Sequence, residues 1–146
     1  MPRTYHLVNH AEADALVPGG PFPGLTHQTL SAPGGSPDSA LWRHQMAEKV
    51  VVPPHYHAAD ETVVVLTGCL RFHVGVAAAD YEAGTDPYAD EVVVDCGPEA
   101  TIIVPRGTIH GYEIVATPAD VLIFMADPKG QTFLPGGDVM RLPWNG

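Results

Sequence analysis

Hydrophobic and polar residues alternate in short runs along the middle of the chain. In the run LWRHQMAE, residues 41–48, the side chains of Trp42, His44 and Met46 fall on one face of an extended segment. The residues between them, such as Gln45, fall on the opposite face. This period of two predicts a β-strand that has one face in a core and the other toward solvent.

Other runs are rich in valine and end at glycine or proline, which is typical of β-strands. The segments predicted as strands are residues 25–30, 41–48, 61–67, 70–76, 92–94, 100–104, 110–116 and 121–126. A turn at Gly68–Cys69 is expected to join 61–67 and 70–76 as a hairpin. No run has the period of a convincing helix. Several short strands separated by turn residues predict an all-β sandwich or barrel.

The chain of 146 residues is expected to form one domain, 1–146, because its length suits a single core and no internal repeat is visible. Residues 1–40 are rich in proline and glycine and predict an irregular N-terminal arm. Residues 41–126 contain the alternating runs and predict the barrel. Residues 127–146 combine turn residues with large apolar ones, and this tail is expected to cap one end of the sandwich.

The charge balance limits the kinds of partner that the chain can bind. Seven Lys and Arg stand against 17 Asp and Glu, a net charge of −10, so neither nucleic acid nor an anionic membrane is expected as a partner. No apolar segment has the length of a signal peptide or a membrane span, and we therefore predict a cytoplasmic protein. The two cysteines, Cys69 and Cys96, imply no disulfide framework.

One stretch, HYHAADETVVVLTG, carries the clearest chemistry of the chain. His55 and His57 stand one residue apart, so on an extended segment both imidazoles project from the same face. Glu61 follows closely and adds a carboxylate. Imidazole suits Zn, Cu, Fe and Ni, and a carboxylate adds a harder oxygen ligand. His110, in the stretch VPRGTIHGY, is available as a further nitrogen ligand.

These two stretches resemble the two motifs of the cupin superfamily. The first motif, HxH followed by a glutamate and then a glycine, is matched by His55, His57, Glu61 and Gly68. The second motif, PxGxxH, is matched by residues 105–110. The resemblance implies a cupin-type jelly-roll β-sandwich or barrel, which agrees with the all-β prediction from the residue pattern. It also implies a homodimer, the usual assembly of small cupins.

The resemblance further implies one divalent transition metal ion, Fe, Mn, Ni or Zn, held by the four motif residues His55, His57, Glu61 and His110. Three imidazoles and one carboxylate on a six-coordinate ion leave two positions for water or substrate, which is a feature of catalytic sites. Glu61 has two alternative roles. It is a metal ligand, or, as in some cupins, it leaves the metal and acts as the catalytic base.

The remaining candidates concern the wall of the cavity. His44 is a substrate contact or proton shuttle, or else a buried histidine satisfied by a backbone carbonyl, which is the commoner situation. Gln45 falls where cupin cavities sometimes carry a polar group that orients the substrate, and its alternative is an exposed position. Val63, Phe72 and Tyr112 suggest an apolar or aromatic ligand, although such residues also form ordinary cores. His27 lies in the irregular arm, and no role is assigned to it.

Three functions follow from this ligand set. The leading hypothesis is a dioxygenase-type enzyme acting on an apolar or aromatic small molecule that reaches the metal through oxygen. The alternative is a non-redox cyclase or isomerase, such as a polyketide cyclase, which would use Zn or Ni. The third is a cupin that binds a small molecule without catalysis. The ligand residues alone discriminate poorly between metals, and hence between the first two hypotheses.

Overall fold

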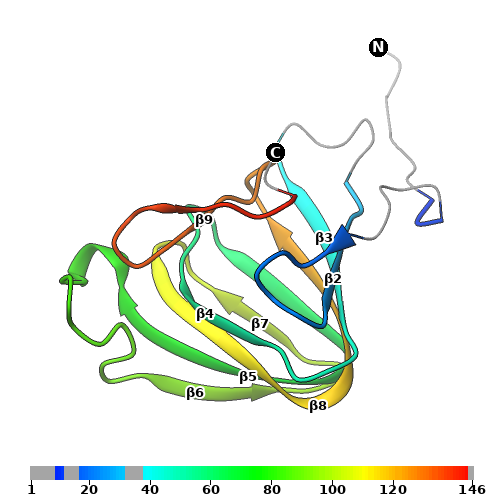
Figure 1. The fold of residues 1–146 in the computed structure, drawn as a ribbon, viewed down its shortest axis with the longest axis horizontal. Helices are drawn as coiled ribbons and strands as arrows, with labels where there is room; N and C mark the ends of the chain where they lie inside the picture. The colour runs from blue at the N-terminus through cyan, green and yellow to red at the C-terminus, as the bar shows by residue number, and fades with distance from the viewer. Residues whose placement is uncertain (1–8, 12–16, 32–37, 145–146) are drawn as a thin grey trace.

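The computed structural model describes residues 9–11, 17–31 and 38–144 (Figure 1). Other parts of the predicted N-terminal arm (1–8, 12–16 and 32–37) and the last two residues of the predicted tail (145–146) lie outside the described residues. The strands are β1 (Val17–Pro18), β2 (Leu25–Thr29), β3 (Ala40–Met46), β4 (Val51–His55), β5 (Glu61–Ala77), β6 (Val92–Cys96), β7 (Thr101–Val104), β8 (Thr108–Met125), β9 (Thr132–Phe133) and β10 (Val139–Met140). The only helical element among the described residues is a 3-10 turn, η1 (Ala78–Asp80). The predicted all-β class is therefore confirmed.

Two long antiparallel strands, β5 and β8, run through both layers of the barrel (Figure 1). The first part of β5 and the last part of β8 lie in one layer, where β3 and β7 pair with them and β2 and β1 continue the sheet. The last part of β5 and the first part of β8 lie in the other layer, flanked by β6 and β4. The two layers are thus joined by strands that bend from one to the other.

The predicted hairpin at Gly68–Cys69 is wrong, because residues 61–77 form one continuous strand. The pairing of β5 with β8 shifts in register at Thr67 and Cys69, and Gly68 between them has a φ of +81°. A glycine with positive φ marks a bulge as well as a turn, so the local sequence does not distinguish the two. The predicted strands 110–116 and 121–126 are likewise one strand, β8.

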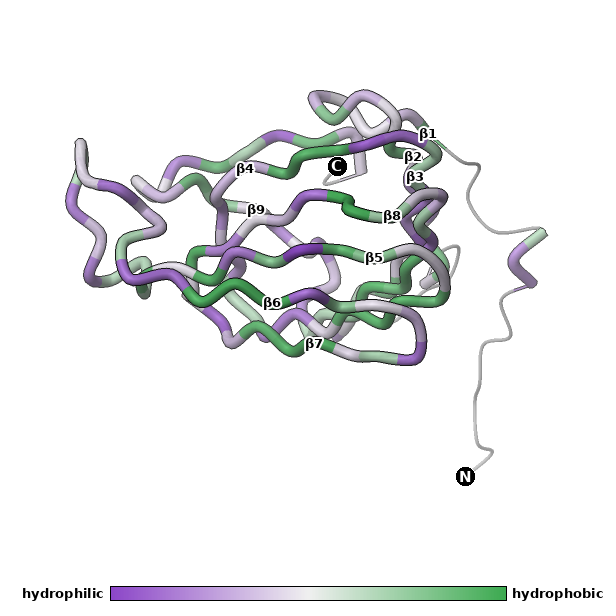
Figure 2. The backbone as a smooth tube through the Cα atoms, turned by 90° about the horizontal axis from the view of Figure 1, so that it is seen from below, coloured by the Kyte–Doolittle hydropathy of each residue, from purple (hydrophilic) through white to green (hydrophobic). Residues whose placement is uncertain are grey.

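The strand predicted at 25–30 is present as β2 and pairs with β3 at the margin of the predicted barrel. In β2, Leu25 and His27 are buried and Thr29 is half-buried. In β3, Trp42, His44 and Met46 are buried, whereas Gln45 points away from the core. Figure 2 shows hydrophobic and hydrophilic stretches following one another along the strands, as expected when each strand has one face on the core.

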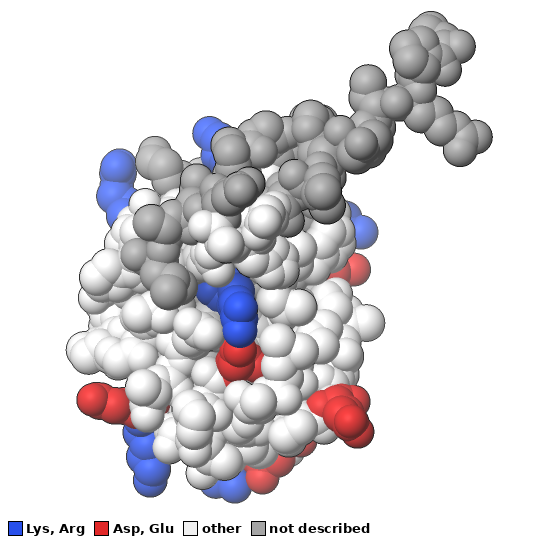
Figure 3. All heavy atoms as spheres, turned by 90° about the vertical axis from the view of Figure 1, so that its right-hand side faces the viewer, with Lys and Arg blue, Asp and Glu red and all other residues white. Residues whose placement is uncertain are grey.

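Charged side chains are few on the face drawn in Figure 3, and a basic side chain near its centre adjoins an acidic one. On the outer side of β3, the Arg43 guanidinium donates two hydrogen bonds to the Asp120 carboxylate, with N···O distances of 2.9 and 2.6 Å. This two-pronged pair links β3 to β8 and raises the pKa of Arg43. No helix in the described part of the chain is long and apolar enough to cross a membrane.

Candidate metal centre and cavity

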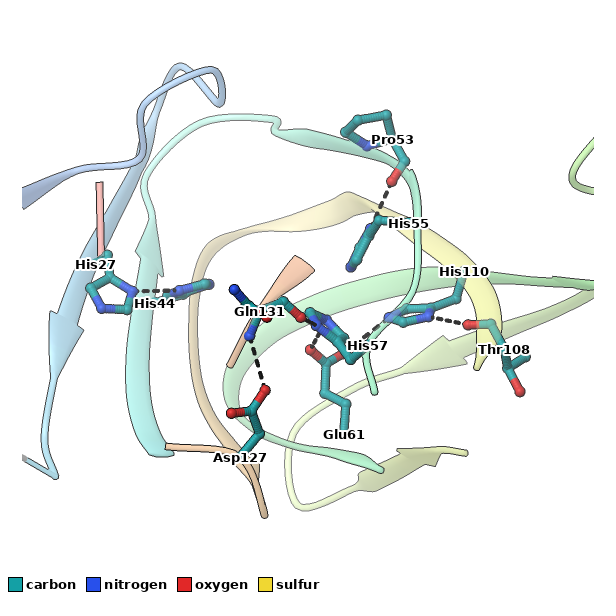
Figure 4. A network of polar contacts seen from close by, with 10 residues as sticks. All are labelled: His27, His44, Pro53, His55, His57, Glu61, Thr108, His110, Asp127 and Gln131. Carbon is teal, nitrogen blue, oxygen red and sulfur yellow. Dashed lines mark hydrogen bonds and ion pairs between the residues drawn. The ribbon is translucent and has the colours of Figure 1, made fainter. Parts of the chain in front are cut away.

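The structure brings His55, His57, Glu61 and His110 together at one end of the barrel (Figure 4). His55 ends β4 and lies directly opposite His110 of β8, and Glu61 begins β5. One ligand atom from each of the four residues lies within 4.8 Å of the others. All four side chains are buried, with at most 4% of any residue exposed. Pro53 and Pro54 precede His55 and favour the extended backbone that aims both histidines of the HxH pair inward.

Backbone carbonyls orient all three imidazole rings in the same way. The Nδ1 atoms of His55, His57 and His110 each lie 2.8 Å from a carbonyl oxygen, those of Pro53, Gln131 and Thr108 respectively. A carbonyl only accepts hydrogen bonds, so each Nδ1 carries the proton and donates it. In a neutral ring the Nε2 atom is then an unprotonated acceptor, which is the form that binds a metal ion.

The carboxylate of Glu61 faces two of these Nε2 atoms. Its oxygens lie 2.9 Å from His57 Nε2 and 3.2 Å from His110 Nε2. His57 Nε2 is buried and makes no hydrogen bond in spite of this short distance. A carboxylate and an imidazole lone pair repel each other at this range unless a proton or a metal cation lies between them. The donor set therefore fits a divalent transition metal ion, and three neutral imidazoles with one carboxylate match the preferences of Fe, Mn, Ni and Zn.

Burial and the neighbouring charges set the protonation of the cluster. Burial, reinforced by His110 and His57, holds the pKa of His55 well below its ordinary value, so this ring is neutral. Burial opposes charge on Glu61 and on His57 as well, but the attraction between the two outweighs it. The pKa of Glu61 is consequently well below its usual range and that of His57 is raised. Glu61 is a carboxylate at neutral pH, as a metal ligand must be.

The carbonyl that orients His57 belongs to a short loop held by Asp127. The Asp127 carboxylate accepts hydrogen bonds from the backbone N–H groups of Lys129 and Gln131, with N···O distances of 3.1 and 3.2 Å. We expect Asp127→Ala to loosen this loop and to lower metal affinity about 10-fold, because the ring of His57 loses its fixed orientation. Titration calorimetry with zinc measures this change. Asp138→Ala removes an exposed carboxylate of the same charge and should leave the affinity unchanged.

Three of the four residues, His55, His57 and Glu61, border a largely apolar cavity inside the barrel. Its other walls come from β2, β3, β4, β8, β9, β10 and the C-terminal segment, namely from Phe22, Leu25, Trp42, His44, Val52, Tyr112, Ile123, Thr132, Met140, Leu142 and Trp144. The free volume is about 30 Å³, which holds about two water molecules. A larger ligand therefore requires side chains of the wall to move.

Two of the predicted substrate contacts, His44 and Tyr112, line this cavity, and three do not. Gln45 lies on the opposite face of β3, because alternation along the strand directs His44 inward and Gln45 outward. Val63 and Phe72 are fully buried in the hydrophobic core and do not reach the cavity. The structure therefore does not place these three residues at the cavity.

Sequence reasoning missed His27 and Trp144. His27, 1% exposed, lies opposite His44 in the β2–β3 pair, and the ring of Trp144 stacks on it with centroids 4.1 Å apart. The alternation of Leu25, His27 and Thr29 is visible in the sequence and would have indicated an inward-facing histidine. No comparable local signal marks Trp144, because its position depends on where the tail crosses the barrel.

No protein-family model matches the chain, and no curated protein matches it either. Among solved structures, the chain is similar to the polyketide cyclase RemF from Streptomyces resistomycificus, with a TM-score of 0.59 and 19% identity over 96% of this chain and 82% of that chain. It is also similar to the cupin domain of Cnp3 from Schizosaccharomyces pombe, with a TM-score of 0.57 and 15% identity over 78% of this chain and 69% of that chain.

A variant of oxalate decarboxylase from Bacillus subtilis gives a TM-score of 0.64 at 15% identity, over 90% of this chain but only 33% of that one. At these identities the likeness concerns the fold alone. Together with the architecture described above, it establishes that the chain has the cupin fold. Proteins of this fold include both oxidative and non-redox enzymes, so the fold does not decide the reaction.

Proposed function

We propose that this chain is a metal-dependent enzyme that binds an apolar or aromatic oxygenated small molecule in the cavity beside the four-residue cluster. The observation that carries the proposal is the convergence of three imidazoles and one carboxylate, of which His55, His57 and Glu61 border an apolar cavity. His55, His57, Glu61 and His110 would hold one Fe, Mn, Ni or Zn ion. When bound, this ion would act as a Lewis acid toward an oxygen of the substrate.

The residues of the chain itself account for the other requirements of such a site. The aromatic and aliphatic walls favour a flat or apolar substrate. The low pKa of Glu61 makes its carboxylate a weak base, which favours the role of ligand over that of catalytic base. We retain the homodimer expected from the resemblance as a further proposal.

For the reaction type we favour a non-redox cyclase or isomerase. The cavity contains an additional buried ionisable side chain, His44, which could move a proton to or from a substrate. RemF, which is named a polyketide cyclase, matches this chain over most of both lengths, whereas oxalate decarboxylase matches over one third of its own. A dioxygenase-type reaction is the second candidate. Four protein ligands on a six-coordinate ion would leave two positions, one for a substrate oxygen and one for dioxygen.

Turnover without oxygen tests this choice. The zinc-loaded and iron-loaded chains are incubated with aromatic β-diketones and phenolic ketones, with and without strict exclusion of oxygen, and products are analysed by mass spectrometry. We expect products of unchanged mass, or of mass reduced by one water, at equal rates in both atmospheres. Oxygen consumption in step with turnover would instead support the dioxygenase. Binding without any product would support a non-catalytic cupin, and His55→Ala serves as the control without metal.

A further inference from the structure

A chain of three polar side chains leads outward from the cavity through β3 and β2. His44 Nε2 lies 2.9 Å from His27 Nδ1, and His27 Nε2 lies 2.8 Å from the Thr29 hydroxyl oxygen. His44 lines the cavity, and in Figure 4 it lies on the side of His27 that faces the four-residue cluster. Both rings are buried, with 4% and 1% of each residue exposed, whereas Thr29 is half-buried. The hydrogen-bonded row His44–His27–Thr29 therefore connects the cavity to a hydroxyl within reach of solvent.

The atom at the cavity end of this hydrogen-bonded row, His44 Nδ1, has no hydrogen-bond partner among the described residues. His44 Nδ1 is buried and makes no hydrogen bond, and the same is true of the indole Nε1 of Trp144, whose ring centroid lies 5.3 Å from that of His44. Both residues line the same cavity. Leaving a buried polar atom unpaired costs about 1–3 kcal/mol, so these two atoms indicate a place for a polar group of a ligand or water.

Two arrangements of protons satisfy the two hydrogen bonds, His44–His27 and His27–Thr29, equally well. In the first, Thr29 donates to His27 Nε2, His27 Nδ1–H donates to His44 Nε2, and His44 Nδ1 carries a proton toward the cavity. In the second, both bonds run in the opposite direction, and His44 Nδ1 offers a lone pair instead. Both rings are neutral in either arrangement. Burial, together with the neighbouring His44, lowers the pKa of His27 to about 3, and burial lowers that of His44 to about 4, which keeps both rings neutral near pH 7.

We propose that His44, His27 and Thr29 form a proton relay, and that His44 Nδ1 exchanges a proton with an oxygen of the ligand in the cavity. When His44 Nδ1 takes a proton from a ligand hydroxyl, His44 Nε2 passes its own proton to His27 Nδ1. His27 Nε2 then passes a proton to the Thr29 oxygen, and the original Thr29 hydroxyl proton leaves to water. One proton enters, one leaves, and neither ring becomes charged.

The relay indicates the class of ligand. A group that gives a proton to His44 Nδ1 or takes one from it, beside the Trp144 N–H donor, is an oxygen that alternates between hydroxyl and oxyanion forms, as in an enol or phenol. The stacked aromatic rings around it suit a flat molecule. This assignment of the ligand rests on the function proposed above, whereas the relay itself requires no metal.

Nitrogen NMR of the metal-free full chain with 15N-labelled histidine tests the relay. For the ring nitrogens of His27 and His44 we expect shifts between those of protonated and unprotonated nitrogen, because the two arrangements interchange. Thr29→Val removes the outer hydroxyl, and the shifts should move to those of one fixed tautomer. Thr26→Val changes the opposite face of the same strand and should leave the intermediate chemical shifts of the His27 and His44 ring nitrogens unchanged. Shifts of a single tautomer in the unmodified chain would overturn the relay.

Catechol, a flat molecule with two adjacent hydroxyls, tests the ligand. Added to the zinc-loaded chain, it should change the signals of His44 Nδ1 and of the Trp144 indole N–H. Catechol that binds, as judged by its ultraviolet absorption, and leaves both signals in place would overturn the assignment of His44 to the ligand. If the chain binds neither zinc nor catechol, the proposed metal function is contradicted. The NMR result on the metal-free relay does not depend on that function and would still stand.

Discussion

Replacing His55 by alanine is expected to abolish stoichiometric metal binding while the barrel stays folded. The substitution removes one of three converging Nε2 donors, and we expect metal affinity to fall at least about 100-fold, more than the loss of an outer contact would cause. His55 is the best of the four positions for this test. Its ring is neutral, and the ion pairs of Glu61 within the cluster are with His57 and His110, so the removal of His55 leaves the ion pair of Glu61 with His57 in place.

Elemental analysis and zinc titration of the purified variant measure this loss, and circular dichroism reports the fold. His73→Ala is the matched control, since His73 lies on the outer side of β5, where it contacts Glu91. Full metal occupancy in His55→Ala would refute the assignment of the site. His57→Ala is a less clean test, because it leaves the buried Glu61 carboxylate without its main counter-charge and would destabilise the fold as well.

Gly68→Ala is expected to lower the free energy of unfolding by about 3–5 kcal/mol, through two costs that add. The backbone of Gly68 has a φ of +81°, which side chains of L-residues rarely adopt. A Cβ at this position would also lie 2.6 Å from the Cα of Ala119 and 2.7 Å from the carbonyl oxygen of Ala116, both in β8. Backbone atoms of a paired strand cannot move aside as a flexible side chain can, so β5 and β8 would have to separate at the bend.

Gly84→Ala separates these two costs. Gly84 has nearly the same φ, +84°, but no atom of the described residues beyond its own neighbours in the chain lies within 4 Å of where its Cβ would be. Only the conformational cost applies there, and we expect a loss of about 1 kcal/mol. Urea unfolding of both variants measures the difference. Equal losses at the two positions would show that the close approach of β8 contributes nothing at Gly68.

Much of the fold and of the candidate site could be predicted from the sequence, because both depend on local periodicity. Alternation in 41–48 identifies the buried face of β3, and the spacing of His55 and His57 places both rings on one side of an extended segment. Glu61 and His110 were included through their motif spacing. The first two inferences require only the period of a strand, whereas the inclusion of Glu61 and His110 depends on the resemblance to the cupin motifs.

Contacts between distant segments could not be predicted in this way. The carbonyl that fixes the tautomer of His57 belongs to Gln131, 74 residues further along the chain. The pairing of His27 with His44 depends on the register of β2 against β3, and the place of Trp144 depends on the path of the tail over the barrel. Glycine at 68 suits a bulge as well as a turn, and only the partner strand β8 distinguishes them.

The sequence by itself therefore determined the strand class, the inward face of β3 and the shared face of His55 and His57, since these follow from a period of two. The full set of four metal ligands followed from the resemblance to the cupin motifs. Only the tertiary structure decided which nitrogen of each histidine faces the centre, how small the cavity is, and that His44 is connected through His27 to Thr29. These properties arise from packing between segments far apart in the chain, and a local pattern carries no information about the register in which such segments meet.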